Sequence, residues 1–166
     1  MDDKNIIKEY SREPTIEDLV ELCRNFNKHK VKYVVIGGFA VIHYGYVRGT
    51  MDIDILVDAS VENIKKIKKA LLYLPDKAVK EMRDDDLDVY NVVRVADEII
   101  VDLLKQVGTI DYKEASKHIE YKEVDGVKIP YIGLELLLKT KMTYRAKDKD
   151  DRLHLEHILK ERKKQR

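Results

Sequence analysis

The chain has few of the features that define several large protein classes. It carries a single cysteine, Cys23, among 166 residues, which excludes a disulfide framework and a cysteine-based zinc site. No apolar run approaches the ~20 residues that a membrane-spanning helix requires. The formal net charge is only +1 although 38% of the residues are charged, so overall charge gives no reason to expect a nucleic-acid-binding protein.

These absences favour a protein that works in the cytoplasm without a membrane anchor. The charged N-terminus MDDKNIIKEY lacks the apolar region of a signal peptide, and a single cysteine suits a reducing compartment. A length of 166 residues is enough for one domain with a hydrophobic core. We therefore expect a polar lead-in over residues 1–12 and a single domain over 13–166, whose C-terminal helices occupy about 133–166.

The segment 33–58 carries most of the chemical signal. An apolar run ends at Gly37-Gly38, a turn follows over 45–49, and a second apolar run contains Asp52 and Asp54. Residues i and i+2 of a strand point to the same side, so the two carboxylates are expected a few ångströms apart. Adjacent carboxylates resist joint ionisation unless a cation lies between them. The pair therefore predicts a divalent-metal site.

Asp102 is the candidate third carboxylate. It interrupts the apolar run 99–104, where burial of a lone charge costs several kcal/mol unless another group compensates. A metal shared with the first two carboxylates would compensate, and a salt bridge to Arg94 across a hairpin is the structural alternative. Asp88 is the second candidate for the same position.

Hydrophobic periodicity predicts the other elements. Helices are expected over about 15–28, 39–43, 60–72, 111–118, 134–144 and from 148 onward, with Thr15 and Ser60 as N-caps. Strands are expected over about 32–36, 52–57, 88–95 and 99–104, the last two as a hairpin. Asp125-Gly126 predicts the turn of a second, tight hairpin over 124–129, and the acidic run 84–86 is expected in a loop.

The order of these features resembles a known superfamily. An apolar strand, Gly37-Gly38, about a dozen residues and then Asp-x-Asp in a second strand are similar to the nucleotidyltransferase superfamily with the DNA polymerase β-like fold. The segment Arg48-Gly49-Thr50-Met51-Asp52-Ile53-Asp54 resembles the R-x-T-x-D-h-D signature of its small stand-alone members, including AbiEii-type toxins and lincosamide-type antibiotic nucleotidyltransferases. Residues 141–151, KMTYRAKDKDD, resemble the K-x-x-x-R-x-K-D-x-x-D pattern near the end of the same families.

The resemblance, over about residues 30–160, implies both a fold and an activity. The implied fold is α/β (α+β), with a mixed sheet flanked by helices and closed by a C-terminal helical segment. The implied activity is magnesium-dependent transfer of a nucleoside monophosphate from an NTP such as ATP to an acceptor hydroxyl, with release of pyrophosphate and with manganese as the alternative ion. Asp52, Asp54 and Asp102 are then the catalytic residues and metal ligands. The acceptor stays open among a small molecule, an RNA and a protein.

Six further residues are candidates for nucleotide binding. Gly37 and Gly38 lack a Cβ and let the backbone approach a triphosphate, or they form a strand-to-helix turn without a ligand. Arg48 could grip a phosphate and Thr50 could orient Asp52, unless both are plain loop residues. Lys141 and Arg145 lie four residues apart and could reach phosphates from one helix face. Asp148 and Asp151 are expected to cap the last helix or to pair with Arg145.

Two other functions fit part of the sequence. A non-catalytic NTP-binding protein, or a toxin–antitoxin partner protein of the same fold, would keep the carboxylates without turnover. A metal-dependent nuclease would use the same carboxylates, but it would leave Gly37-Gly38 without a purpose. A homodimer and a toxin–antitoxin complex are both open as assemblies.

Overall fold

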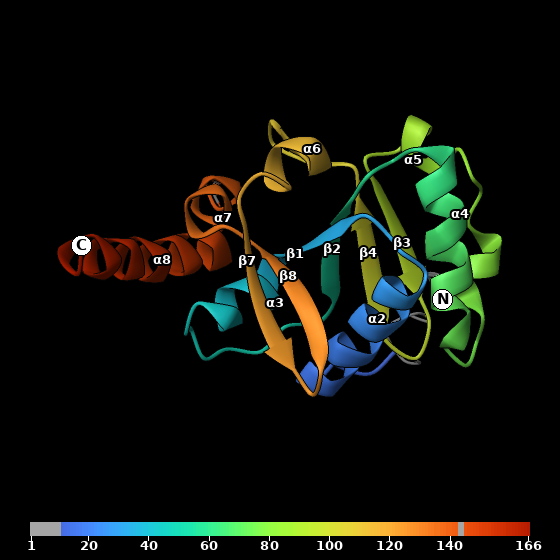
Figure 1. Cartoon of the computed structure of the whole chain (residues 1–166), viewed down its shortest axis with the longest axis horizontal. Helices are drawn as coiled ribbons and strands as arrows, with labels where there is room; N and C mark the ends of the chain where they lie inside the picture. Colours follow the sequence, from blue (N-terminus) through green and yellow to red (C-terminus); the bar gives the residue numbers. More distant parts are fainter. Residues whose placement is uncertain (1–10, 143–144) are drawn as a thin grey trace.

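A six-stranded mixed sheet forms the centre of the protein. In the computed structural model, which describes residues 11–142 and 145–166, the strands lie in the order β3-β4-β2-β1-β8-β7 (Figure 1). Strands β2 and β4 are parallel, as are β1 and β8, whereas the other neighbours are antiparallel. The mixed sheet expected from the sequence is therefore confirmed. The bounds are Tyr33–Ile36 (β1), Ile53–Val57 (β2), Val92–Ala96 (β3), Ile100–Leu104 (β4), Ile119–Val124 (β7) and Val127–Ile132 (β8).

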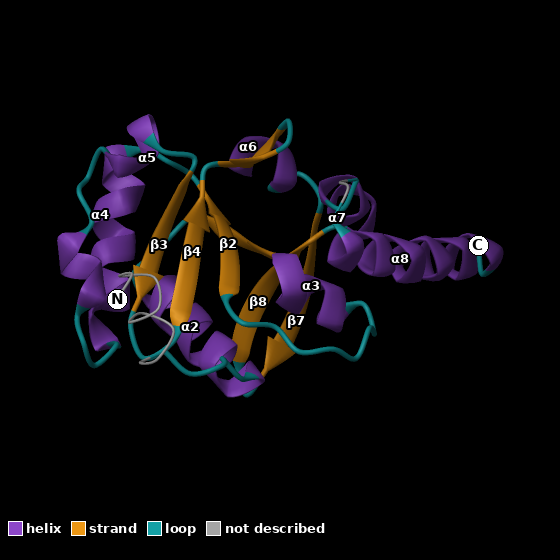
Figure 2. Cartoon of the chain, turned by 180° about the vertical axis from the view of Figure 1, so that it is seen from behind, coloured by secondary structure: helices purple, strands orange, loops and turns teal. Residues whose placement is uncertain are grey.

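Helices cover both faces of this sheet. The helices α2 (Ile16–Lys28) and α4 (Val61–Ala70) pack against each other, and α3 (Gly37–His43) lies on the opposite face from α2 (Figure 2). Thr15 and Ser60 cap α2 and α4 as predicted, since each side chain accepts a hydrogen bond from the backbone N–H three residues on. Of the apolar residues at helical spacing in this segment, Leu19, Val20, Cys23 and Phe26 lie in the core, whereas Ile16 stays exposed.

The second hairpin also forms where it is predicted. Asp125 and Gly126 both have positive φ, 51° and 77°, as a tight two-residue turn between antiparallel strands requires. Pairing continues beyond the expected range, from residue 119 to 132. Short elements complete the connections: η1 (Leu71–Tyr73), η2 (Ala78–Glu81), α5 (Asp86–Val89), β5 (Gln106–Val107), β6 (Ile110–Asp111) and α6 (Tyr112–Ala115).

The segment around residue 88 differs from the prediction. The strand expected from residue 88 begins only at Val92, and the helix α5 takes up part of the predicted loop and strand. The N–H of Tyr90 donates to the carbonyl oxygen of Asp86 at 2.8 Å, which closes the helical turn. Leu87 is fully buried while its neighbours are more exposed. The burial of this one leucine, and not an alternation of buried and exposed residues, therefore determines the conformation of the segment.

The C-terminal segment forms two helices, α7 (Leu134–Thr140) and α8 (Ala146–Lys164). The helix expected over 134–144 therefore ends early, and residues 143–144 lie outside the described residues. The helix α8 extends away from the sheet in both views (Figures 1 and 2), and its buried residues are Asp148, Asp151 and Leu155. Among the helices of the described part of the chain, none is both long and apolar enough to cross a membrane.

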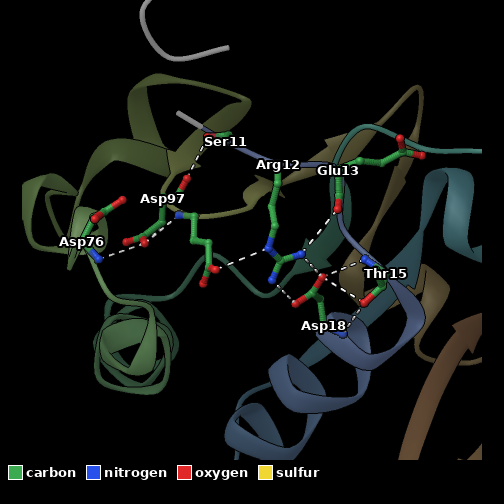
Figure 3. A network of polar contacts seen from close by, with 8 residues as sticks. Ser11, Arg12, Glu13, Thr15, Asp18, Asp76 and Asp97 are labelled. Atoms are coloured by element: carbon green, nitrogen blue, oxygen red, sulfur yellow. Dashed lines mark hydrogen bonds and ion pairs between the residues drawn. The ribbon is translucent and has the colours of Figure 1, made fainter. Parts of the chain in front are cut away.

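The described N-terminal residues are fixed to the turn between β3 and β4. Residues 1–10 of the expected lead-in lie outside the described residues. The Ser11 hydroxyl donates to the carbonyl oxygen of Asp97 at 2.7 Å (Figure 3). The backbone N–H of Arg12 donates to the carbonyl oxygen of Glu98 at 2.9 Å. These bonds set where the chain enters α2.

Candidate active site

Three carboxylates meet on one face of the sheet. Strand register places Asp54 of β2 beside Asp102 of β4, and Asp102 beside Arg94 of β3. Directly opposed residues of neighbouring strands share a face, and Asp52, two residues before Asp54, shares it as well. One oxygen atom from each of the three aspartates lies within 4.8 Å of the other two. The structure thus brings together the three residues that the sequence proposes.

The cluster is electrostatically strained without a cation. Burial, and then the charges of Asp52 and Asp102, raise the pKa of Asp54 to about 7. Burial and the neighbouring Asp102 also raise the pKa of Asp52. Carboxylate oxygens are the ligands that Mg²⁺ and Mn²⁺ prefer, so this donor set fits a divalent cation. In the described part of the chain, no other group of three His, Cys, Asp or Glu side chains comes as close together.

Arg94 neutralises part of this cluster. Its Nε donates to Asp102 Oδ1 at 2.9 Å and its Nη2 donates to Asp102 Oδ2 at 2.9 Å, a bidentate pair. The same Nη2 lies 3.4 Å from Asp52 Oδ2. The salt bridge weighed as an alternative for Asp102 therefore forms, and it forms within the acidic cluster.

Asp88, the second candidate for the third carboxylate, lies elsewhere. It is exposed in α5 and does not belong to the carboxylate cluster. Because β3 begins only at Val92, the β3 residue beside Asp102 is Arg94. Of the two candidates, the geometry selects Asp102.

Gly37 and Gly38 let α3 begin directly against the cluster. Gly37 has a φ of +66°, and a Cβ on it would overlap Asp54 Oδ2. A Cβ on Gly38 would lie 2.5 Å from Thr50 Oγ1. Side chains larger than hydrogen are therefore excluded by packing alone. The phosphate contact expected of the two glycines stays a prediction.

The residues before Asp52 are held by internal hydrogen bonds. Thr50 is buried, and its hydroxyl donates to the carbonyl oxygen of Asp52 at 3.1 Å. Arg48 Nη1 donates to the carbonyl oxygen of Gly49 at 2.7 Å, and its Nη2 donates to Asp151 Oδ2 at 3.0 Å. Arg48 Nε lies 2.9 Å from Asp151 Oδ1. Arg48 thus makes two hydrogen bonds within the chain and one close charge contact, between Nε and Asp151 Oδ1, that is not aligned as a hydrogen bond.

A buried ion network connects this loop to the C-terminal helices. Lys141 Nζ lies 3.2 Å from Asp151 Oδ2 and 3.5 Å from Asp148 Oδ1. Arg145 Nε donates to Asp148 Oδ2 at 3.0 Å, as expected for that pair. Lys141 and Arg145 do not share a helix face, which corrects the prediction, because Lys141 is the C-cap of α7 and Arg145 is the N-cap of α8.

Lys147 is a site residue that the residue-by-residue reasoning missed. It lies in the first turn of α8, and its positive charge lowers the pKa of both Asp52 and Asp54 against the larger effect of burial. Its only signal in the sequence is its place as the second lysine of the 141–151 pattern. The N-terminal end of α8 therefore faces the acidic cluster.

Comparison with known proteins identifies the fold. No family model and no curated protein sequence matches the chain. Its structure is similar to a protein from Thermotoga maritima described as a putative nucleotidyltransferase, at 20% identity and a TM-score of 0.51, over 91% of this chain and 93% of that one. It is also similar to the lincosamide antibiotic adenylyltransferase LnuA, solved with lincomycin bound, at 20% identity and a TM-score of 0.58, over 89% of this chain and 99% of that one. The chain has the nucleotidyltransferase-like fold that the resemblance implied.

Proposed function

We propose that the protein is a nucleotidyltransferase that moves a nucleoside monophosphate from an NTP to an acceptor hydroxyl and releases pyrophosphate. The observation that carries the proposal is the cluster of Asp52, Asp54 and Asp102, whose oxygens lie within 4.8 Å of one another. A catalyst of phosphoryl-type transfer needs little more than positioning and charge stabilisation. The shared fold with two proteins named for nucleotidyl transfer supports the same activity.

The three carboxylates have distinct duties in this proposal. Asp52 and Asp54 hold Mg²⁺, with Mn²⁺ as a substitute, and Asp102 completes the ligand set from the neighbouring strand. When bound, the ion offsets the negative charge that develops on the transferred phosphate. We expect the acceptor hydroxyl to lose its proton near Asp102, which lies opposite Asp54. Arg94 must loosen its bidentate hold on Asp102 for this set to close.

Cationic and backbone groups around the cluster are assigned to the triphosphate. The backbone at Gly37 and Gly38 can approach the phosphates because no Cβ intervenes. Lys141, Arg145 and the newly identified Lys147 bring positive charge from the two C-terminal helices. Thr50 contacts Asp52 as expected, through the carbonyl oxygen of that residue. Arg48 is bound to Asp151 in the free protein, so we assign it first to fixing the loop before Asp52.

A second candidate function is NTP binding without turnover, as in a regulatory or toxin–antitoxin partner protein. The bidentate Arg94–Asp102 pair favours it, because the third carboxylate is neutralised by the chain itself. Transfer and binding must therefore be measured separately. We place either activity in the cytoplasm, in keeping with the single cysteine.

Label transfer from each of the four α-labelled NTPs tests the proposal. The acceptors are lincomycin, chosen because the structural neighbour LnuA was solved with it, and fractionated cell extract as a source of small molecules, RNA and protein. The Asp52→Asn/Asp54→Asn variant should abolish Mg²⁺-dependent transfer, and the surface variant Asp84→Asn/Asp85→Asn should retain it. If the wild type binds NTP without transferring label, the regulatory candidate is favoured. If the wild type neither binds NTP nor transfers label, the assignment of the site is refuted.

A further inference from the structure

A cavity of about 350 Å³ lies next to the acidic cluster, between the start of α2, the helix α3, the loop before β2 and the β7–β8 hairpin. Its walls are apolar over most of their extent and carry charges of both signs. The lining residues are Glu13, Pro14, Ile16, Phe39, Ile42, His43, Arg48, Gly49, Thr50, Lys122 and Tyr131.

The composition of the cavity suits a small organic molecule with an apolar part. Phe39 and Tyr131 are buried core residues, whereas Ile16 stays 41% exposed although it is apolar. Small-molecule sites typically combine such apolar walls with a few polar groups that fix orientation, in volumes from ~300 Å³ upward. A ring seated here would cover the exposed isoleucine.

The cavity and the carboxylates share two stretches of backbone. Thr50 lines the cavity and donates to the carbonyl oxygen of Asp52. Phe39 lines it as well, two residues after Gly37, which packs directly on Asp54. Two residues span at most ~7 Å. A nucleotide whose phosphates lie at the carboxylates can therefore place its base in the cavity.

His43 lines the cavity and carries a buried hydrogen-bond acceptor. Its ring stacks on Tyr131 with a centroid distance of 4.0 Å, and its Nε2 lies 3.2 Å from Glu120 Oε1. Burial lowers the pKa of His43, so the neutral ring donates from Nε2 to the carboxylate and keeps a lone pair on Nδ1. Within the described residues, Nδ1 is buried and has no hydrogen-bond partner.

Glu13, three residues before α2, offers a second acceptor. Arg12 holds this stretch of chain through two bonds to Asp18, at 2.6 and 2.7 Å. The side chain of Glu13 points away from that network in Figure 3, and it lines the cavity. In the described part of the chain no side chain donates to its carboxylate.

We propose that this cavity binds the nucleobase of the NTP, and that Glu13 and His43 favour bases that carry an exocyclic amino group. Two acceptors suit the amino groups of adenine, cytosine and guanine. Uracil has no exocyclic amino group, and although its N3–H can donate one bond, a carboxylate repels the carbonyl oxygens on either side of it. The inference rests on the proposed nucleotidyltransferase function and adds the place of the base and its selection.

A tryptophan at the cavity rim tests the location, because the chain contains none of its own. Ile16→Trp places an indole at the first residue of α2, and Val61→Trp places one at the first residue of α4, at a similar exposure of 47%. Titration with Mg·ATP should change the fluorescence of the Ile16→Trp protein, or weaken its ATP binding about tenfold or more. The Val61→Trp protein should show neither effect, and inorganic triphosphate should leave both indoles unchanged.

Base selection is tested with Glu13→Gln in the otherwise native chain. The wild type should bind ATP at least about tenfold more tightly than UTP, since hydrogen bonds to charged groups discriminate by about that factor. Glu13→Gln should bring the ratio toward one, and Glu17→Gln, on the exposed first turn of α2, should preserve it.

The outcomes separate this inference from the proposed function. If ATP binds in an Asp54-dependent way while the Ile16→Trp protein shows neither a fluorescence change nor weaker binding, the base lies elsewhere and the cavity assignment is wrong. Equal affinity for ATP and UTP in the wild type would overturn the selection by Glu13 and His43. Absence of NTP binding in every variant and in the wild type would instead overturn the nucleotidyltransferase proposal.

Discussion

Arg94 and Asp102 face each other across β3 and β4 and form two hydrogen bonds of 2.9 Å. The same aspartate lies opposite Asp54 on the other side of its strand. Asp102 therefore stands between a cation supplied by the chain and the place where a metal ion is expected. The two cations compete for one carboxylate.

Removal of this arginine should strengthen metal binding. We expect Arg94→Ala to bind Mn²⁺ about tenfold more tightly, equivalent to about 1.4 kcal/mol, because Asp102 no longer has to exchange one cation for another. The metal-free variant should be about 1 kcal/mol less stable, a modest loss since Arg94 is half exposed. Calorimetric titration measures the affinity for Mn²⁺, and thermal unfolding measures the stability. Arg83→Ala, which removes a surface pair with Asp85, serves as the control, and equal affinities in the two variants would contradict the competition.

The stability of the metal-free protein should fall as pH rises from about 4 to about 7. The pKa of Asp54 rises from its ordinary value of 3.8 to about 7 in the folded state, so the folded chain binds more protons than the unfolded chain in this window. Stability from that difference is fully present below pH ~4 and is lost as pH passes 7. Urea unfolding at several pH values measures it. Asp54→Asn should flatten this dependence, and an unchanged slope would show that another group is responsible.

Metal binding should show the complementary pH dependence. Asp54 must give up its proton to bind a cation, so the affinity for Mg²⁺ should weaken by up to about tenfold per pH unit below about 7. Titration calorimetry in buffers of different ionisation enthalpy should detect the released proton at pH 6. No proton release at that pH would mean that Asp54 is already ionised in the folded protein.

Gly37→Ala should damage both stability and the carboxylate cluster. An added Cβ overlaps Asp54 Oδ2, and the φ of +66° adds strain. Gly108→Ala is the matched control, because Gly108 has a φ of +58° but no atom within 4 Å of the new Cβ. The control should cost about 1 kcal/mol and keep its Mn²⁺ affinity, whereas Gly37→Ala should cost more and lose metal binding. If both variants behave alike, glycine is needed at position 37 only for its positive φ and not for its contact with Asp54.

Asp151→Asn should be strongly destabilising. Asp151 is fully buried and pairs with both Arg48 and Lys141, so the substitution leaves the buried Lys141 and the partly buried Arg48 short of a partner, at a cost of about 3 kcal/mol. Glu156→Gln removes the partner of Arg152 on the surface of the same helix and should cost less than about 0.5 kcal/mol. Chemical denaturation followed by circular dichroism compares them. Comparable losses would mean that the buried network contributes little.

Much of this fold could be predicted from the sequence because its signals are local. The caps at Thr15 and Ser60 and the Asp125-Gly126 turn depend on the nearest few residues. Asp52 and Asp54 could be paired because strand alternation alone places them on one side. These inferences require no knowledge of which strands are neighbours.

The parts that could not be predicted depend on contacts between distant residues. The parallel pairing of β2 with β4 places Asp102, and not Asp88, beside Asp54. No local sequence pattern encodes this pairing. Arg48 is of a residue type that often binds phosphate, yet its guanidinium binds the carboxylate of Asp151, 103 positions later in the chain. The cavity beside α3 draws on four separate segments, so none of them carries its signature alone.

The bond between Arg48 and Asp151 also orders events during synthesis of the chain. At translation rates of roughly 5–20 residues per second, the 103 positions between the two residues take about 5 to 20 seconds to add. Every strand of the sheet has been made by then, since β8 ends at Ile132. The loop that leads into Asp52 can therefore bind Asp151 only after all strands of the sheet have been synthesised, so this side of the site forms last.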